Sequence, residues 1–297
     1  MPPYFRPLLI VAAVVLVASM IEALVLAHAQ PNQYDWKAAG VSLLDLAVRP
    51  ILTLLPLSIA APVFAFAWSH RLATVPLNGA AAFVLLFIGQ EFCYYWYHRA
   101  AHRVRWFWAT HAVHHSPNQL NLSAAYRLGW TGKLTGTALF FVPLVFLGFA
   151  PGLVLATVSL NLFYQFWIHA TWIPRLGWLE NVINTPSAHR VHHASNLDYL
   201  DANYGGVLIV FDRLFGTYVA ERDNEPCRYG LVKPIDGYNI LQIEFHVWVA
   251  MARDVLSARG IGETLGFVFR PPGWRPDGIG ETTEDLRLQE NPAIMET

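Results

Sequence analysis

The sequence predicts an all-α integral membrane protein with about four to five hydrophobic spans, including a helical hairpin, and a cytosolic cap of histidine-rich helices. Three observations support this fold class. Hydrophobic residues make up 55% of the 297 residues and charged residues only 14%, whereas soluble domains carry about 25% charged residues. Apolar runs of membrane-spanning length recur along the first 172 residues. Nine of the twelve histidines are gathered at four places.

The first three spans are expected at Leu8–Ala27, Pro50–Ser69 and Leu77–Tyr97. The first run has the length that crosses a hydrocarbon core at about 1.5 Å per residue. A cleaved secretory signal is the competing interpretation, but the run is long and more spans follow it, so we expect a retained helix. Prolines at positions 56 and 62 predict kinks in the second span. The third span ends in an aromatic cluster typical of a membrane boundary.

The later elements are a hairpin, two amphipathic segments and a tail. Leu134–Ala150 and Gly152–Trp172 are expected to form the helical hairpin, because the turn between them is too short for a crossing loop. Val41–Arg49 has an amphipathic pattern that favours the membrane interface. Asn239–Arg259 has helical periodicity and is expected to cover the domain or to rest on the membrane. The segment after Pro271 is expected to be a loosely held terminus.

These elements predict three parts of the chain. N-terminal membrane helices occupy 1–76, membrane helices with the histidine motifs occupy 77–235, and an amphipathic helix with a loosely ordered tail occupies 236–297. Basic residues gather beside the histidine motifs, so the positive-inside rule places the motifs on the cytosolic side of a multi-pass protein. These basic residues are Arg99, Arg103, Arg105, Arg127, Lys133, Arg175 and Arg190.

The overall charge and the cysteine count exclude two classes of protein. The net charge is −1, and the chain has no basic tail or acidic block, so nothing indicates a nucleic-acid partner. Cys93 and Cys227 are the two cysteines. They are too few for a disulfide framework, and we expect free thiols.

The clustered histidines have the spacing of metal ligands. Histidines three or four residues apart lie on one face of a helix, so an HxxxH motif offers two rings to one metal. In HxxHH the adjacent histidine points about 100° away, which favours a second metal. Imidazole binds zinc, copper, iron and nickel, so the spacing does not name the metal. The expected ligands are His98, His102, His111, His114, His115, His169, His189, His192 and His193.

Burial beside a membrane strengthens the metal interpretation. Many titratable side chains are costly there unless something pairs with them. Glu91 lies two helical turns before His98, and we expect its carboxylate to hold a histidine ring nitrogen and fix its tautomer. Asp198, Asp201 and Asn203 fit either outer hydrogen-bonding partners or simple turn residues. The isolated histidines, expected to be ordinary hydrogen-bonded residues, are His28, His70 and His246.

Short sequence segments in and around the motifs follow one another in a characteristic order. They read Glu91-Phe-Cys-Tyr-Tyr-Trp-Tyr-His98-Arg, Asn184-Thr-Pro-Ser-Ala-His189-Arg-Val-His192-His193, Asn203-Tyr-Gly-Gly and Asp212-Arg-Leu-Phe-Gly-Thr-Tyr218. This order resembles the fatty acid hydroxylase or sterol desaturase superfamily, in detail its bacterial branch related to alkylglycerol monooxygenases. The resemblance implies two iron ions in a non-haem di-iron centre held by the nine histidines. It also implies O2 as co-substrate, a hydroxylated or desaturated lipid, and a bacterial inner membrane.

Three positions depart from the pattern of that family. Ala188 stands where many relatives have a further histidine, which would leave one metal with fewer ligands. Arg103 replaces the glutamate that follows HxxxH in alkylglycerol monooxygenases, so their exact activity is not implied. Glu91 stands where aspartate is common.

The expected reaction is oxidation of an alkyl chain. An unactivated C–H bond needs a redox-active metal, which zinc is not, and water must be kept from the oxidant. A lipid can approach from the bilayer between apolar helices. The sequence has no haem, flavin or iron–sulfur motif. Electrons are therefore expected from a separate partner, which is a reductase, a ferredoxin or a cytochrome.

Two other classes of function remain open. A membrane zinc-dependent hydrolase of a lipid ester or amide also needs buried histidines, but it predicts more carboxylates in the motifs. A metal transporter or sensor predicts ligands along a path through several spans, whereas these motifs lie at the ends of spans. The sequence leaves open which lipid is used, and whether it is hydroxylated or desaturated.

Overall fold

A computed structural model of the chain describes residues 5–29, 31 and 33–290. Within these residues the chain is helical, as predicted, with two isolated β-bridges and no strand. The α-helices (α) and 3-10 helices (η) are α1 (Phe5–Ala29), α2 (Trp36–Thr53), α3 (Ala60–Ser69), α4 (Ala80–Arg103), α5 (Arg105–His111), η1 (Leu122–Tyr126), α6 (Gly132–Thr135), η2 (Thr137–Phe141), α7 (Val142–Leu147), α8 (Pro151–Trp167), η3 (Gly177–Asn181), α9 (Pro186–His192), α10 (Val210–Leu214), α11 (Ile240–Ser257), α12 (Ile261–Phe269) and α13 (Thr283–Glu290).

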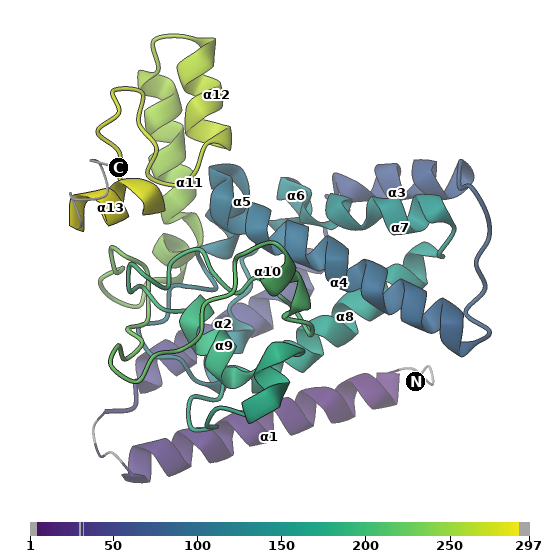
Figure 1. Ribbon diagram of the computed structural model, residues 1–297, viewed down its shortest axis with the longest axis horizontal. Coiled ribbons are helices and arrows are strands. Elements are labelled where there is room, and N and C mark those ends of the chain that lie inside the picture. The colour runs from purple at the N-terminus through teal and green to yellow at the C-terminus, as the bar shows by residue number, and fades with distance from the viewer. Residues whose placement is uncertain (1–4, 30, 32, 291–297) are drawn as a thin grey trace.

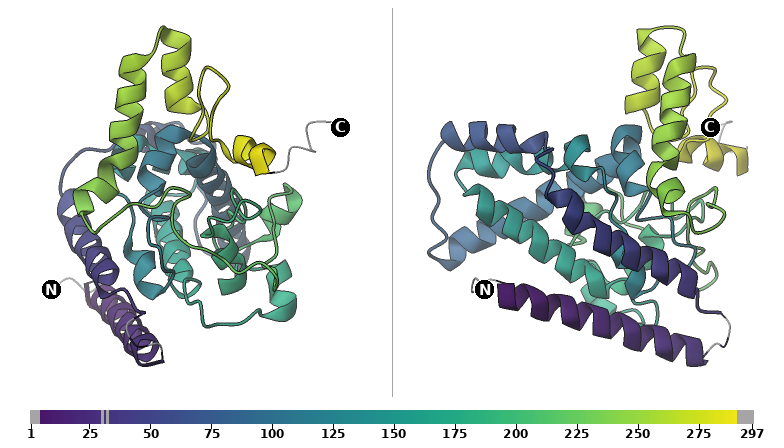
Figure 2. Two further views of the ribbon diagram at one scale, coloured as in Figure 1. Left: turned by 90° about the vertical axis from the view of Figure 1, so that its left-hand side faces the viewer. Right: turned by 180° about the vertical axis from the view of Figure 1, so that it is seen from behind.

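Three long helices set the overall arrangement. α1, α4 and α8 run lengthwise through the molecule, and α3 and α7 lie at one end (Figure 1). The main hydrophobic core lies between α3, α4, α7 and α8 and includes Phe64, Leu86, Val145 and Phe149. The loops between α8 and α11 lie at the opposite end, where α11 and α12 project sideways as a hairpin (Figures 1 and 2). The histidine motifs are at this second end.

One helix in the described part of the chain is long and apolar enough to cross a membrane by itself. Residues Leu9–Ala29 of α1 contain an 18-residue stretch with a mean hydropathy of 2.8, and only 17% of that stretch is buried. The polar side chains of Ser19 and Glu22 are buried against the protein, while leucine and valine side chains point outward. α4 begins at Ala80, three residues after the start of the predicted third span, and continues past its predicted end without a break to Arg103.

The predicted second span, Pro50–Ser69, is wrong as a single helix. α2 ends at Thr53 and α3 begins at Ala60. Pro56 lies in the break, where it has no N–H to donate and disfavours a helical conformation in the residue before it. Pro50 is accommodated inside α2.

The first arm of the predicted hairpin, Leu134–Ala150, is also divided. Gly136 has a left-handed φ of 77° and separates α6 from η2, because a residue in that conformation ends a helix. The turn into α8 is present as predicted and passes through Gly148, whose φ is 121°. A Cβ on Gly148 would lie 2.4 Å from the carbonyl oxygen of Ala73, so only glycine fits there.

α2 is amphipathic, as predicted, but its polar face points inward. Ser42 and Asp45 are buried, whereas Leu43 and Leu44 are exposed. The guanidinium of Arg127 donates to the Ser42 hydroxyl at 3.0 Å. An inward polar face with an outward apolar face is typical of a helix that contacts lipid.

The C-terminal segment is docked through residue 290, which corrects the prediction of a loosely held tail. The last part of that prediction, 291–297, lies outside the described residues. Arg287 on α13 donates to the carbonyl oxygens of Leu197 at 3.0 Å and Leu200 at 2.8 Å. The sequence did not show this docking, because the partners of Arg287 are backbone atoms far away along the chain.

Replacing Arg287 by alanine should release α13. Two hydrogen bonds from a charged group are lost, which costs about 1–3 kcal/mol locally. Amide hydrogen exchange should become faster in 283–290 and stay unchanged in α4. The matched control is Arg253→Ala on the exposed face of α11, which should leave exchange in 283–290 unaltered. Equal exchange in both variants would show that other contacts hold α13.

Candidate metal centre

All nine histidines expected as ligands lie in two compact groups. The nine side chains are buried, and within each group the candidate ligand nitrogens all lie within 4.8 Å of one another. The five-histidine group contains His98, His102, His111, His115 and His192. The four-histidine group contains His114, His169, His189 and His193. His28, His70 and His246 belong to neither group.

Each HxxHH motif is divided between the two groups, as expected. The outer histidines of a motif, four residues apart, share one group, and the middle histidine joins the other. The expectation that each motif is one helix is wrong for the first motif, since α5 ends at His111 and a turn follows. This turn lets His114 reach the carbonyl oxygen of Arg127, which its Nδ1 contacts at 3.0 Å.

The ring nitrogens face one another at separations that suit shared metal ligands. Nε2 of His111 lies 2.9 Å from that of His98 and 3.2 Å from that of His115. In the four-histidine group the corresponding separations are 3.0–3.4 Å. A metal bound to imidazole at roughly 2.0–2.1 Å places adjacent ligands about 3.0–3.4 Å apart. In the five-histidine group, Nε2 of His102 and of His192 is buried and has no hydrogen-bond partner within the described residues. Together with the separations above, these donor sets fit one metal ion in each group.

Backbone carbonyls hold the second nitrogen of several rings. A ring whose Nδ1–H donates to a carbonyl keeps the lone pair of Nε2 for a metal, and its orientation is fixed. Nδ1 of His102 lies 3.5 Å from the carboxylate of Asp201. The four carbonyl contacts, at 2.7–3.0 Å, are His98 to Tyr204, His114 to Arg127, His169 to Gln165 and His192 to Ala202.

Two buried carboxylates hold the loop 201–208, which supplies two of the four carbonyls and the carboxylate of Asp201 beside His102. Asp212 accepts hydrogen bonds from the N–H groups of residues 204 and 205 at 2.7 Å each. Glu91 accepts from the N–H groups of residues 207 and 208 at 2.8 Å each. The positions of the acceptor carbonyls therefore depend on Asp212 and Glu91.

Glu91 acts at a different place from the one predicted. Its hydrogen bonds in the described part of the chain go to the loop 201–208 and to the amide of Asn161 on α8, not to a histidine. Asn161 accepts from the side chain of Gln165, whose carbonyl holds His169. The prediction of a direct contact is wrong because the Glu91 side chain points toward α8 and the loop.

Asp212 is a site residue that motif spacing did not indicate. Its side chain is fully buried, and this burial raises its pKa to about 6 despite hydrogen bonds from Thr217 and from the loop. Two signals were available: Asp212 opens the stretch Asp212–Tyr218 that resembles the family, and it is a carboxylate at the end of the apolar stretch 207–211, which needs partners when it is buried.

The segment Asn-Tyr-Gly-Gly lies in the same loop, and contacts there explain its asparagine and its second glycine. Asn203 has a left-handed φ of 58°, and its side-chain amide donates to the carbonyl of Ala188 at 2.9 Å. Gly206 packs against α8, where a Cβ would lie 2.1 Å from the side-chain nitrogen of Asn161. Asn203 and Asp201 therefore have structural roles at the site, whereas Asp198 pairs with Arg222 on the surface.

Burial favours the neutral form of most of the histidine rings. Burial lowers the pKa of His114 to about 4. Burial and the neighbouring rings hold the pKa values of His111, His115 and His193 well below the usual range. A neutral ring has the lone pair that a metal requires. Neither group includes a carboxylate or a thiol, and an all-imidazole set suits zinc, copper or iron.

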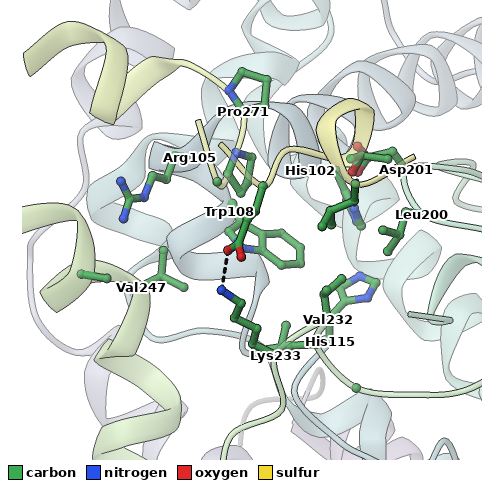
Figure 3. Close-up of a pocket in the computed structure, with 18 of the residues that line it drawn as sticks. His102, Arg105, Trp108, His115, Leu200, Asp201, Val232, Lys233, Val247 and Pro271 are labelled. Carbon is green, nitrogen blue, oxygen red and sulfur yellow. Dashed lines mark hydrogen bonds and ion pairs between the residues drawn. The ribbon is translucent and has the colours of Figure 1, made fainter. Parts of the chain in front are cut away.

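A large cavity reaches the five-histidine group. We call it the amphipathic cavity; it has a volume of about 430 Å³ and touches His102, His115 and His192. Figure 3 shows His102 and His115 beside Trp108 in its wall. Lys233, also in the wall, forms an ion pair with Glu281.

A smaller cavity reaches both groups. We call it the apolar cavity; its volume is about 210 Å³, and it lies between α4, α8 and residues 128–141. It touches His111 of the five-histidine group and His114 of the four-histidine group. Most of its wall consists of aliphatic and aromatic side chains, so it suits a hydrocarbon segment.

Known proteins are similar in sequence to the part of the chain that carries the histidines. Residues 83–217 match the fatty acid hydroxylase family. Alkylglycerol monooxygenases of Xenopus tropicalis and Homo sapiens are each 37% identical to the chain, over 77% and 79% of it and over 52% and 53% of their own lengths. The chain thus spans about half the length of these curated relatives. No solved structure matches it.

More distant relatives match a shorter region. An ornithine lipid hydroxylase of Rhizobium tropici is 33% identical over 46% of this chain and 41% of its own length. A Delta(7)-sterol 5(6)-desaturase of Gibberella zeae is 30% identical over 46% of this chain and 37% of its own length. The family match contains all nine histidines, Glu91 and Asp212. The chain therefore belongs to the fatty acid hydroxylase and sterol desaturase superfamily, on the side related to alkylglycerol monooxygenases.

Proposed function

We propose that the chain is a membrane-bound non-haem di-iron oxygenase that hydroxylates or desaturates a lipid with O2. The observation that carries this proposal is the apolar cavity, which touches one histidine of each group. A hydrocarbon segment in that cavity lies beside both candidate metal positions. The names of the relatives, a lipid hydroxylase, a sterol desaturase and alkylglycerol monooxygenases, support the same class of reaction.

Iron suits the proposed reaction better than the other metals that imidazole binds. Zinc is redox-inert and cannot exchange electrons. Two iron ions held by the two groups supply, with O2, the oxidising power that an unactivated C–H bond requires. Hydroxylation places one atom of O2 in the lipid and reduces the other to water, so two electrons and two protons come from outside. We propose a separate electron-transfer partner, which is a reductase, a ferredoxin or a cytochrome.

The residues of the chain hold the hydrocarbon and exclude water in this proposal. The hydroxyl of Tyr94, in the cavity wall, donates to the side chain of Gln165 at 3.0 Å. It therefore offers the cavity no unpaired polar group. Phe141 and Val158 supply apolar surface in the wall of the same cavity as the two histidines. A dry site protects the oxidation from side reactions with water.

We further propose that the protein is multi-pass, with the histidines on the cytosolic side. The helices that wall the apolar cavity expose large apolar side chains on their outer faces, which suits contact with lipid. Examples are Leu85 on α4 and Leu160 on α8, which are 60% and 63% exposed. A lipid chain can then enter the cavity sideways from the bilayer.

Lipid mass spectrometry under 18O2 tests the reaction. Cells that express the protein should contain a lipid that gains one labelled oxygen, and cells that express His192→Ala should not. A lipid that loses two hydrogens without label would identify a desaturase. Unchanged lipids with well-expressed, iron-loaded protein would contradict the oxidation proposal and favour the zinc-dependent hydrolase.

The metal content tests the division of the histidines into two groups. His192→Ala removes one ligand of the five-histidine group and should lower bound iron from about two toward about one ion per chain. Elemental mass spectrometry of the purified protein measures this ratio. His70→Ala, in a residue outside both groups, should retain the full content. Zinc at both positions in active protein would contradict the di-iron proposal.

Filling the apolar cavity should stop oxidation without removing metal. Leu162 lines the cavity, so Leu162→Trp should reduce product formation about tenfold or more with unchanged iron. Leu160 lies on the same helix but outside the cavity, and Leu160→Trp is the matched control. Equal activity of the two variants would show that the hydrocarbon lies elsewhere, and the amphipathic cavity would then be the place to test.

A further inference from the structure

The hairpin of α11 and α12 has an apolar stripe on its outer side. Ile261, Leu265 and Phe269 are four residues apart on α12 and therefore share one face. They are 80%, 50% and 56% exposed, and Leu256 at the end of α11 is 86% exposed. Single exposed leucines are ordinary, but a stripe at helical spacing marks an interaction surface. We call these four side chains the hairpin stripe.

Part of the hairpin is packed against the rest of the protein. Val247 and Met251 of α11 are buried in the body of the protein. Gly266 of α12 packs under Trp274, where a Cβ would lie 2.4 Å from the indole ring. The hairpin is therefore held in place. The stripe remains open to the surroundings, as do the apolar side chains of Leu241, Phe245 and Val249 on α11.

The surface beside the stripe is basic. The acidic side chains there are engaged: Asp254 pairs with Arg105 at 2.7 Å, and Glu263 accepts from a backbone N–H at 2.7 Å. No ion pair within residues 33–290 involves the exposed arginines of the hairpin. These arginines are Arg253, Arg259 and Arg270.

The hairpin is oriented across the long helices. It projects sideways from the histidine-bearing end of the molecule, across the direction of α4 and α8 (Figures 1 and 2). α12 is on the side turned toward α3, and α13 is on the other side (Figure 1). If α4 and α8 enter a bilayer, the hairpin lies along its surface, with α12 as the nearer helix.

We propose that the hairpin stripe binds the surface of a bilayer that contains anionic phospholipids. The apolar side chains lie at the boundary of headgroups and acyl chains, and the arginines contact phosphate groups. The proposal rests on the membrane setting of the proposed function but not on its chemistry. The same hairpin walls the amphipathic cavity through His246 and Val247, so binding holds that cavity at the level of the lipid headgroups.

Fluorescence quenching of the full chain in nanodiscs tests this proposal. Cys93→Ala and Cys227→Ala provide a background free of thiols, and iron content checks its folding. A nitrobenzoxadiazole label is attached at Leu265→Cys, or at Leu256→Cys as a second position. The control label is at Asp223→Cys, a surface position whose side chain is 93% exposed. Discs contain phosphatidylcholine with or without phosphatidylglycerol, and quenchers are doxyl lipid in the bilayer and iodide in water.

The stripe labels should be quenched several-fold more by doxyl lipid than the control label, and less by iodide. Arg259→Gln should weaken the doxyl quenching in discs that contain phosphatidylglycerol, and should have no effect in discs of phosphatidylcholine alone. Iodide quenching equal to that of the control would overturn the proposal. Protection from iodide without doxyl quenching would also overturn it, because a second copy or a protein partner would then cover the stripe. Neither quenching measurement needs enzyme turnover. A failed oxidation assay would therefore contradict the proposed function without affecting the test of membrane binding.

Discussion

Nine imidazole rings can share so small a volume only if each ring is held in one orientation. Their nitrogens face one another at 2.9–3.4 Å, an unfavourable arrangement for neutral lone pairs unless a cation or a proton lies between them. In four of the rings the Nδ1–H group donates a hydrogen bond to a backbone carbonyl oxygen. A backbone carbonyl does not titrate and has no rotamers, so its position is set by the fold. The fold therefore fixes the orientation of these four rings. Two of the four carbonyls, and the carboxylate beside His102, come from the single loop 201–208.

That loop depends in turn on two buried carboxylates. Asp212 and Glu91 each accept two of its backbone N–H groups. A hydrogen bond to a charged group contributes about 1.5–3 kcal/mol, but a buried carboxylate is tolerated only while all of its partners are present. Glu91 also accepts from Asn161, and it shares α4 with His98. The long helices α4 and α8 and the metal-facing loop therefore form one hydrogen-bonded unit.

The sequence predicts the histidines well and their supports poorly. Spacings of three and four residues determine which rings meet, so the division of each HxxHH motif between two groups followed from the motif alone. The groups that hold the rings in place are mostly backbone atoms. Every residue has these atoms, so the sequence does not show which of them hold a ring. Arg287 reaches carbonyls 87 and 90 residues away, and Glu91 bonds a loop more than 110 residues away. The breaks at Gly136 and Pro56 were visible as residues, but apolar composition continues across both and concealed them.

Two of the three departures from the family pattern, Ala188 and Arg103, concern different parts of the site. Ala188 adds no ring to the nine, and Nδ1 of the neighbouring His189 is buried and has no hydrogen-bond partner within the described residues. The four-histidine group has the smaller donor set, and the apolar cavity reaches it through His114. Arg103 changes no ligand. It pairs with Asp201 of the loop at 2.7 Å and with Glu284 of α13 at 2.5 Å, so an arginine in place of glutamate finds acids on both sides. Because Asp201 also contacts His102, the C-terminal helix is linked to the five-histidine group through one carboxylate. Arg103 thus joins α13 to the residue Asp201 in the wall of the amphipathic cavity, and the set of nine rings is unaffected by it.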